Sequence, residues 1–170
     1  MRARCLVGLE RFIAREAAAL IPELGEVHIE YHAGWDVQNA LENQLSAARE
    51  RDREAGFTRH GAHRADWTLA FHGVAKREHL SRGQAKAAAL VCTLALARWL
   101  KESIGDHPLL CLDDLESELD TPHAVRVIQW LREAAIQAWL TATQVPDSSH
   151  LIGNAKLFHV KRSGCERADP

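Results

Sequence analysis

The sequence predicts an α/β protein in which a mainly helical segment is followed by a part with a parallel sheet. Apolar residues recur every three or four positions between Leu6 and Leu20, a spacing that predicts an amphipathic helix. In the second half, an apolar run at 109–112, a helical pattern from Thr121 and another apolar run around Trp139 succeed one another. Strand, helix and strand in this order are typical of a βαβ unit with parallel strands.

Composition limits the class of protein. A chain of 170 residues with 46% apolar content is long enough for one domain with a real core. The formal net charge of −2 gives no global basic field, so any DNA contact has to come from local patches. No apolar run approaches the roughly 18 to 20 residues of a membrane span. The four cysteines are scattered without a C-x-x-C pair, which suits a reducing cytosol. We therefore expect a cytoplasmic protein without membrane contact.

Two strands are predicted in the first half from alternation of apolar and polar residues. Val27, Ile29 and Tyr31 alternate with polar neighbours up to Gly34, which predicts a half-buried strand. The stretch 67–71 alternates in the same way and is interpreted as one arm of an antiparallel pair.

Two more helices are predicted before the second half. One should begin after Asp36 as N-cap, turn Val37 and Leu45 inward, and end at Gly56. A long alanine-rich helix should occupy 81–105, with a serine as its cap and a glycine at its end.

The remaining elements follow the run LLCL at 109–112. Its continuous apolar character predicts a strand covered on both faces. Thr121 followed by proline indicates an N-cap and a helix start. Two further strands are expected in 136–143 and 156–162.

Two adjacent acids, Asp113 and Asp114, directly follow the strand at 109–112. The carboxyl ends of strands are where α/β folds place ligand chemistry. Two carboxylates there need a counter-charge, which Mg²⁺ bridging to phosphate oxygens would supply, and the second acid can then orient or deprotonate an attacking water. The alternative interpretation is a turn or a helix-cap cluster.

Several motifs together resemble a known family. LSRGQ at 80–84 resembles the signature motif of the ABC and SMC-like ATPases, and LDDLESELD at 112–120 resembles their Walker B motif followed by a D-loop. With GFTRHGAHRAD at 56–66 and LFHV at 157–160, these stretches match the RecF family of bacterial DNA replication and repair proteins. The resemblance spans essentially the whole chain but covers only the carboxyl-terminal half of such a protein.

The resemblance implies a fold in two parts. Residues 67–170 would form the carboxyl-terminal part of an ABC/SMC-like P-loop ATPase head, with signature motif, Walker B and D-loop, and 1–66 a mainly helical lobe segment. The sequence departs from the pattern in three respects, one of which is that no ABC-type switch histidine follows 136–143. It contains no G-x-x-x-x-G-K-[ST] loop to cradle phosphates, and Ala62 stands where the family usually has proline.

The resemblance also implies roles for the acids. Asp113 would hold Mg²⁺ through water, and Asp114 would be the catalytic residue that polarises the hydrolytic water. Ser117 and Asp120, in the D-loop, would sit at a dimer contact.

Nucleotide contacts are implied as well. Ser81, Gly83 and Gln84 should approach the γ-phosphate of an ATP bound on the opposite subunit, at the N-terminus of the following helix. The family commonly uses a small hydroxyl residue in place of the ABC switch histidine, so Thr141 or Thr143 is the candidate.

A basic, turn-rich cluster of Arg59, His63 and Arg64 is a candidate for contact with DNA or phosphate. A solvated loop held by Asp66 is an equally good interpretation.

The function implied by the resemblance is that of a RecF-like protein of DNA replication and recombinational repair, within the SOS response. It implies an ATP-dependent homodimer on single-stranded or gapped DNA that cooperates with RecO and RecR in loading RecA. The family is a weak ATPase, but a chain without the P-loop should be inactive alone. One alternative is a truncated, non-enzymatic fragment that retains only the dimer surface. Another, ranked last, is a metal-dependent nuclease that uses Asp113, Asp114 and Asp120.

Overall fold

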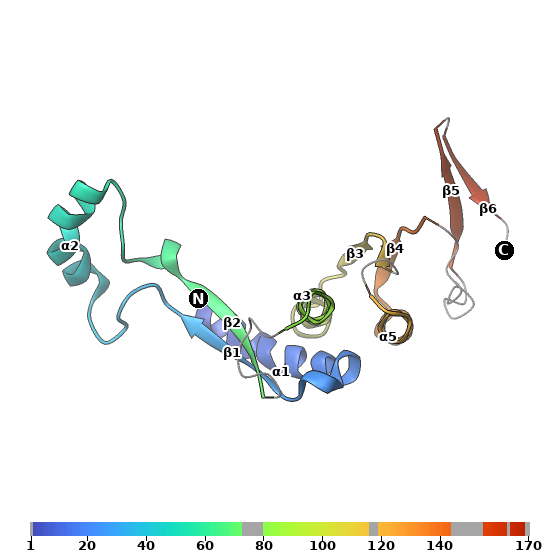
Figure 1. The fold of residues 1–170 in the computed structure, drawn as a ribbon, viewed down its shortest axis with the longest axis horizontal. Coiled ribbons are helices and arrows are strands. Elements are labelled where there is room, and N and C mark those ends of the chain that lie inside the picture. Colours follow the sequence, from blue (N-terminus) through green and yellow to red (C-terminus); the bar gives the residue numbers. More distant parts are fainter. Residues whose placement is uncertain (1, 73–79, 116–118, 144–154, 163, 169–170) are drawn as a thin grey trace. The chain divides into compact units, whose positions relative to one another are not determined.

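The computed structural model describes residues 2–72, 80–115, 119–143, 155–162 and 164–168 (Figure 1). The chain forms two compact units, Met1–Trp99 and Leu100–Pro170, and each is described by itself. None of the helices in the described ranges is long and apolar enough to cross a membrane. The predicted division into a lobe of 1–66 and a head part of 67–170 stays a prediction.

The first unit combines helices with one antiparallel strand pair. Its elements are α1 (Arg2–Leu20), the 3-10 turn η1 (Pro22–Leu24), β1 (Val27–His32), α2 (Leu41–Ala55), the 3-10 turn η2 (Ala62–Arg64), β2 (Asp66–Phe71) and α3 (Arg82–Trp99). The predicted first helix is confirmed as α1, and its apolar stripe packs against α3. The buried residues of these two helices include Phe12, Ile13, Ala17, Leu20, Val91, Leu94 and Ala95.

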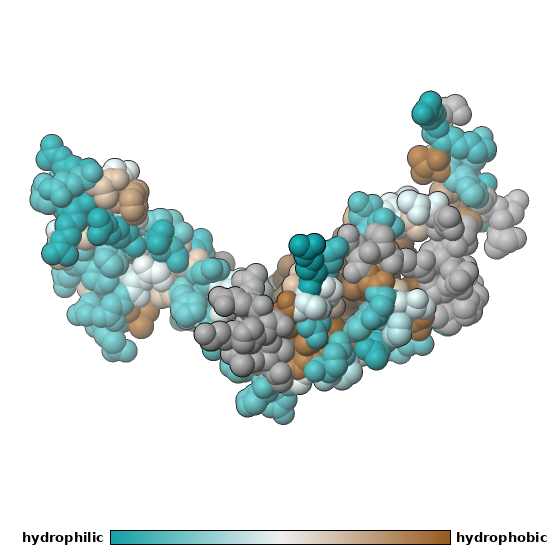
Figure 2. Space-filling view, in the orientation of Figure 1, coloured by the Kyte–Doolittle hydropathy of each residue, from teal (hydrophilic) through white to brown (hydrophobic). Residues whose placement is uncertain are grey.

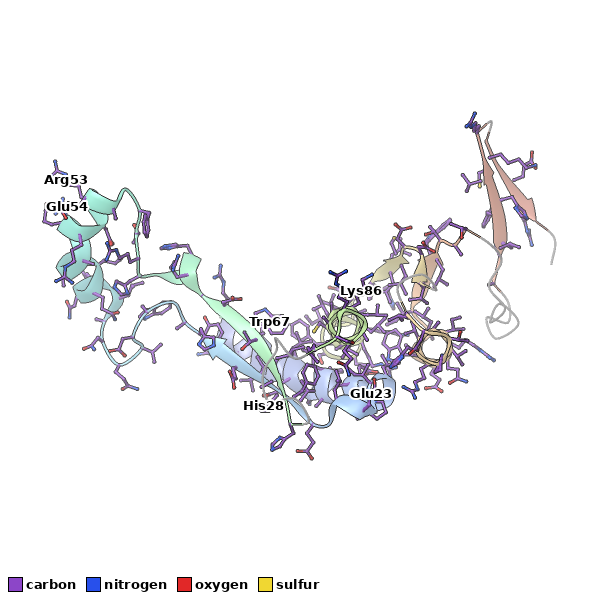
Figure 3. All side chains as sticks on the ribbon, in the orientation of Figure 1. Glu23, His28, Arg53, Glu54, Trp67 and Lys86 are labelled. Carbon is purple, nitrogen blue, oxygen red and sulfur yellow. The ribbon has the colours of Figure 1, made fainter. Side chains whose placement is uncertain are left out.

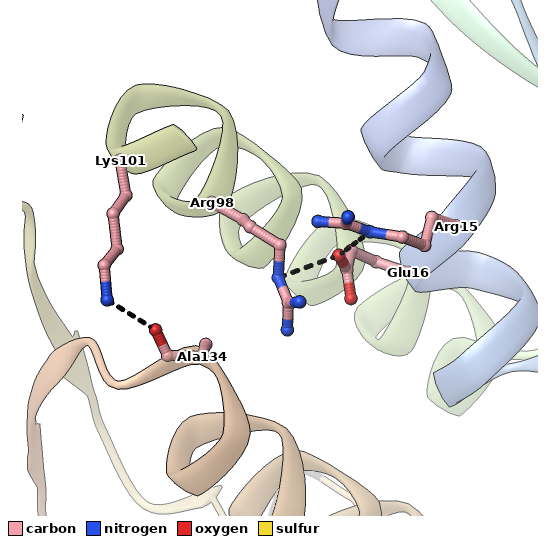
Figure 4. A network of polar contacts seen from close by, with 5 residues as sticks. All are labelled: Arg15, Glu16, Arg98, Lys101 and Ala134. Carbon is pink, nitrogen blue, oxygen red and sulfur yellow. Dashed lines mark hydrogen bonds and ion pairs between the residues drawn. The ribbon is translucent and has the colours of Figure 1, made fainter. Parts of the chain in front are cut away.

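A buried ion pair lies inside this helix pair. Glu16 of α1 is only 2% exposed, and its Oε1 lies 3.1 Å from Nε of Arg98 on α3. Nε of Arg15 donates to the same oxygen at 3.0 Å (Figure 4). Because a buried carboxylate needs counter-charge and hydrogen bonds, the two arginines make its burial possible.

The two strands predicted in the first half, β1 and β2, pair with each other. The alternation predicts one arm of an antiparallel pair at 67–71 but leaves its partner open, and the structure identifies the partner as β1. They are antiparallel, with Val27 opposite Phe71 and Tyr31 opposite Trp67. Val27 and Phe71 are buried, whereas the polar residues of β1 are exposed. His28 and Trp67 mark the two strands in Figure 3.

The helix after Asp36 begins later than predicted. The Asp36 carboxylate accepts hydrogen bonds from N of Gln38 at 3.0 Å and from Nδ2 of Asn39 at 2.7 Å, which closes a turn before the helix. This turn leaves Val37 65% exposed rather than inward, and α2 buries no residue. The predicted helix end is confirmed, because Gly56 adopts a left-handed φ of 75°.

Two glycines hold the end of β1 close to η2. The N–H of Gly61 donates to O of Gly34 at 3.1 Å. A Cβ on Gly34 would lie 2.5 Å from O of Gly61, and Gly34 has a φ of 87°. Only glycine satisfies both conditions at this position.

The second unit contains the predicted βαβ motif. Its elements are the π-helical turn η4 (Leu100–Ile104), β3 (Leu109–Leu112), α5 (Thr121–Ala134), β4 (Gln137–Leu140), β5 (Leu157–Lys161) and β6 (Gly164–Ala168). β3 and β4 are parallel neighbours, with Leu110 opposite Ala138. η4 continues α3 and is followed by Gly105 at a φ of 82°, so the predicted end of the long helix is confirmed. Lys101 in η4 donates through Nζ to O of Ala134 at 2.7 Å, at the end of α5 (Figure 4).

Two details of this motif differ from the prediction. Leu110 and Leu112 are buried, but Leu109 is 53% exposed, so β3 is covered on one face and not on both. The N-cap of α5 is Asp120 and not Thr121, because the Asp120 carboxylate accepts from N of His123. An aspartate is at least as good a cap as a threonine, so the start moves by one residue.

The last two strands form a hairpin. β5 is the strand predicted in 156–162, whereas β6, which pairs with it antiparallel, was not predicted. The ring of Phe158 on β5 stacks on Trp139 of β4, with centroids 6.1 Å apart. Val160 on β5 is 83% exposed, and Figure 2 shows apolar residues on the surface of this unit.

Candidate functional site

One threonine joins the two adjacent acids at the end of β3. Oγ1 of Thr141, directly after β4, donates a hydrogen bond to Oδ1 of Asp113 and accepts one from the backbone N–H of Asp114 at 3.0 Å. The N–H of Thr141 in turn donates to O of Leu112 at 3.0 Å. Because β3 and β4 are parallel, their carboxyl ends meet at one edge, and this brings residues 27 positions apart into contact.

The backbone at Asp114 is left-handed, with a φ of 45°. Aspartate adopts this conformation more readily than most residues, because its short polar side chain can bond locally. The chain therefore turns sharply just beyond β3, with the Asp113 side chain exposed and Asp114 half-buried.

This end of β3 suits a hard cation. Mg²⁺ prefers oxygen ligands and is usually held by one or two carboxylates together with waters and substrate phosphates. Asp113 presents an exposed carboxylate of this oxygen type, held by the Thr141 hydroxyl. Within the described ranges, no group of three or more His, Cys, Asp or Glu residues is placed to hold a metal ion.

The LSRGQ stretch forms a reciprocal cap at the start of α3. The Ser81 hydroxyl accepts from N of Gln84 at 3.2 Å, and Oε1 of Gln84 accepts from N of Ser81 at 2.9 Å. This is a capping box, in which serine and glutamine three residues apart each satisfy the other's N–H. A Cβ added to Gly83, which lies between them, would meet no atom within 4 Å, so the missing side chain leaves open space at the helix start.

Asp120 has a local role that can be seen directly. Its carboxylate contacts Nδ1 of His123 and accepts from N of His123 at 3.1 Å, which caps α5. The side-chain bond and then the backbone bond from His123 hold the pKa of this carboxyl below its ordinary value. Ser117, the other predicted D-loop residue, lies outside the described residues, and Thr143 is exposed two positions after Thr141.

The basic loop is held by contacts within itself and with the helices α1 and α2. Arg59 donates from its backbone N to Oδ2 of Asp52 at 3.4 Å, and its Nε lies 3.8 Å from Oδ1. Nε2 of His63 bonds O of Thr58 at 2.8 Å, and Arg64 closes the turn η2 through its N–H. The loop is therefore held by Asp52, whereas the expected partner Asp66 accepts from N of Trp67 instead.

The sequence indicates the residue types of the site but not all of their contacts. The sequence predicts Thr141 as a candidate for the switch position. It does not predict the hydrogen bonds of Thr141 to Asp113 and Asp114. These bonds depend on the strand register, which sequence alone does not specify. The reciprocal cap of Ser81 and Gln84 has a visible signal, since S-x-x-Q before an apolar run is typical of a capping box.

Known proteins are similar to this chain over nearly its whole length. RecF of Stenotrophomonas maltophilia (strain R551-3) is 44% identical over 148 residues, which are 86% of this chain and 41% of that protein. RecF of Xanthomonas axonopodis pv. citri (strain 306) is 40% identical over 171 residues, covering 98% of this chain and 46% of that protein. The chain thus spans less than half the length of these curated relatives. No protein-family profile matches it.

Solved structures agree on the fold. A RecF structure with ATPrS, described as a recombination mediator protein in the RecFOR pathway, matches 99% of this chain with a TM-score of 0.74 at 22% identity and covers 46% of that chain. An Smc head bound to the C-winged helix domain of ScpA matches 98% of the chain with a TM-score of 0.56 at 17% identity, covering 43% of that chain.

The described part of the chain has the fold of part of an ABC/SMC-like head, as the resemblance implied. The parallel β3–α5–β4 unit carries the stretch that resembles a Walker B motif. The particular protein that the chain matches is RecF, the DNA replication and repair protein, and the match is to its carboxyl-terminal half.

Proposed function

We propose that this chain provides the Walker B, signature and D-loop elements of a RecF-like ATPase head that serves DNA replication and recombinational repair. The observation that carries the proposal is the edge where the Thr141 hydroxyl holds the side chain of Asp113 and the backbone of Asp114. Relatives at 40 to 44% identity are named as DNA replication and repair proteins, which supports the same role.

In this proposal the residues at the end of β3 serve a phosphate-bound cation. Mg²⁺ would supply charge neutralisation at the phosphates of ATP, with Asp113 as its protein ligand. Asp114 would accept the proton of the attacking water and orient it. Thr141 would act as the hydroxyl in the switch position, because it already fixes both acids, and Thr143 is the second candidate.

The start of α3 would serve a nucleotide held by a second subunit. Backbone N–H groups and the helix dipole at this end favour an anion, and the open position at Gly83 lets a phosphate approach. Ser81 and Gln84 would contact the γ-phosphate, and the D-loop residues Ser117 and Asp120 would lie at the same dimer contact. ATP shared between subunits would couple nucleotide binding to dimer formation.

The wider role is proposed from the relatives. The dimer would bind single-stranded or gapped DNA in the cytoplasm, cooperate with RecO and RecR, and support RecA loading in the SOS response. The loop at 59–64 is the candidate phosphate contact. Within this loop, Arg64 is a better candidate for the phosphate contact than Arg59, because Arg59 already contacts Asp52.

Association in the presence of ATP tests the proposal. The chain is mixed with a P-loop-bearing amino-terminal half of a RecF protein, and sedimentation is measured with and without ATP and Mg²⁺. We expect association only with nucleotide. Ser81→Arg should abolish it, because the substitution places bulk and positive charge at the γ-phosphate position, while Ser81→Thr keeps the capping hydroxyl and should retain it.

A third variant separates hydrolysis from assembly. Asp114→Asn should preserve ATP-dependent association and stop turnover of the mixture, since it removes the base but keeps the size of the side chain. Equal association of all variants with and without ATP would contradict the proposal and favour a fragment in which LSRGQ only begins a helix.

A further inference from the structure

A groove on the first unit lies apart from the residues placed in the proposed nucleotide site, although its end includes the first three residues of the stretch 56–66. It runs along α2 and the loop after it, has a volume of about 740 Å³, and includes Leu45 and Phe57 among its lining residues. Phe57 is 58% exposed and Leu45 36%, and α2 buries no residue in the described structure. A helix that buries none of its residues in the described ranges and leaves apolar side chains exposed is a candidate docking surface. Figure 2 shows apolar residues among hydrophilic ones at this helix.

The charges around the groove are asymmetric. Arg49 and Arg53 line it one helical turn apart, and within the described part of the chain neither forms an ion pair. The acid beside them, Asp52, faces Arg59 at 3.8 Å and accepts from its backbone N–H. The two arginines that line the groove therefore carry positive charge without an ion-pair partner in the described structure. Figure 3 labels one of them, Arg53, at the end of α2.

A polar atom at the groove points to the kind of ligand. Oδ1 of Asp52 is buried, and in the described structure it accepts no hydrogen bond. Only 11% of the Asp52 side chain is exposed, so water reaches it poorly. A buried acceptor of this kind is satisfied at little cost by a backbone N–H from an incoming chain.

We propose that this groove binds an acidic, apolar-containing peptide segment of a partner protein. Carboxylates of the segment would pair with Arg49 and Arg53, an apolar side chain would cover Leu45 and Phe57, and a backbone N–H would reach Asp52. DNA fits less well, because its phosphate backbone has no N–H donor for the buried Oδ1 of Asp52, whereas a peptide backbone supplies one. The inference does not depend on the proposed nucleotide chemistry.

Binding of a labelled peptide tests this inference. The probe is a fluorescein-labelled twelve-residue peptide that alternates Asp or Glu with Leu and Phe, titrated with the full chain and followed by anisotropy. We expect saturable binding that weakens with salt. A peptide with Lys in place of each acid should not bind.

Matched variants locate the site. Arg53→Glu should weaken binding about tenfold, because a favourable pair becomes a repulsive one. Arg51→Glu makes the same charge change on the same helix, but Arg51 does not line the groove, so it should leave binding unchanged. Phe57→Ser should also weaken peptide binding. Both Arg51→Glu and Phe57→Ser should keep the circular dichroism spectrum of the parent chain.

Three results would overturn the proposal. The first is that the folded chain does not bind the peptide. The second is that Arg53→Glu and Arg51→Glu lose peptide affinity equally. The third is that a single-stranded oligothymidylate displaces the labelled peptide at a lower concentration than unlabelled peptide does. The last result would assign the groove to nucleic acid.

Discussion

At the scale of single residues, Thr141 uses one hydroxyl as donor and acceptor at once. It donates to the Asp113 carboxylate and accepts from the Asp114 N–H, so both groups are oriented by a residue on another strand. A carboxylate oriented by a neutral hydroxyl keeps its full negative charge, whereas an arginine in the same place would neutralise it. The arrangement therefore leaves Asp113 able to attract a cation.

Asp120 gives a pH-dependent prediction. Its pKa is lowered first by the side-chain bond from His123 and then by the His123 backbone N–H. A carboxyl with a depressed folded-state pKa stabilises the fold above its unfolded pKa, and this contribution is lost as pH falls through the folded value. Asp120→Asn should therefore lower stability at about pH 6 and make progressively less difference towards about pH 3.

Urea unfolding of both proteins at several pH values measures this effect. Asp106→Asn, which also removes a negative charge from an exposed position of the second unit, serves as control. A constant difference between Asp120→Asn and the parent chain at all pH values would show that the aspartate acts only as an uncharged cap.

At the scale of elements, the connection between β1 and η2 depends on Gly34. Gly34→Ala and Gly105→Ala both place a side chain on a left-handed backbone, at φ of 87° and 82°. Both should lose about 1 kcal/mol of unfolding free energy for that reason.

Only the first substitution adds a clash. The new Cβ at Gly34 would meet O of Gly61 at 2.5 Å and the carbonyl carbon of Arg64 at 2.6 Å, whereas the one at Gly105 has no atom within 4 Å. We expect Gly34→Ala to cost about 2 kcal/mol more than Gly105→Ala. Urea unfolding followed by circular dichroism measures the unfolding free energy of both variants. Equal losses of unfolding free energy would mean that the β1–η2 connection shifts without penalty.

Periodicity predicts the elements with strong patterns and misses those set by local bonds. The 3.6-residue spacing in 6–20 and the alternation in 27–31 each correspond to the expected element. The predicted start of α2 is wrong, because Asp36 uses its carboxylate in a turn, and aspartate favours both a turn and an N-cap. The hairpin partner β6 is missed because its sequence, with Glu166 and Arg167, lacks an alternating apolar pattern.

The site is predicted from motifs, which specify residue types and their order but not contacts between strands. The prediction that Asp113 and Asp114 follow the end of a strand is confirmed. The contact with Thr141 requires the parallel register of β3 and β4, a long-range property that local sequence does not encode.

At the scale of the whole molecule, the described sheets are all two-stranded, so each leaves strand edges unpaired within the described ranges. The second unit also exposes Leu109, Trp139 and Val160. Unpaired edges with apolar side chains promote association between molecules. We expect the chain on its own to associate as its concentration rises.

A matched pair of substitutions tests the source of this association. Val160→Lys should lower the apparent mass in static light scattering, because it places charge on a strand that is otherwise free to pair. Val37→Lys, at a residue of the first unit that is 65% exposed and outside any strand, should leave it unchanged. A monodisperse monomer at all concentrations would contradict the prediction.

The capping box at the start of α3 has a consequence for how an arriving ligand would be detected. The amide protons of Ser81 and Gln84 are both bonded to side-chain oxygens and not to carbonyls of the main chain. A phosphate that drew the Ser81 hydroxyl away would release the Gln84 amide, unless the phosphate accepted that proton itself. Helix fraying would raise deuterium uptake at both amides, whereas capture of the Ser81 hydroxyl would change uptake at Gln84 and leave the Ser81 amide bonded to Oε1 of Gln84.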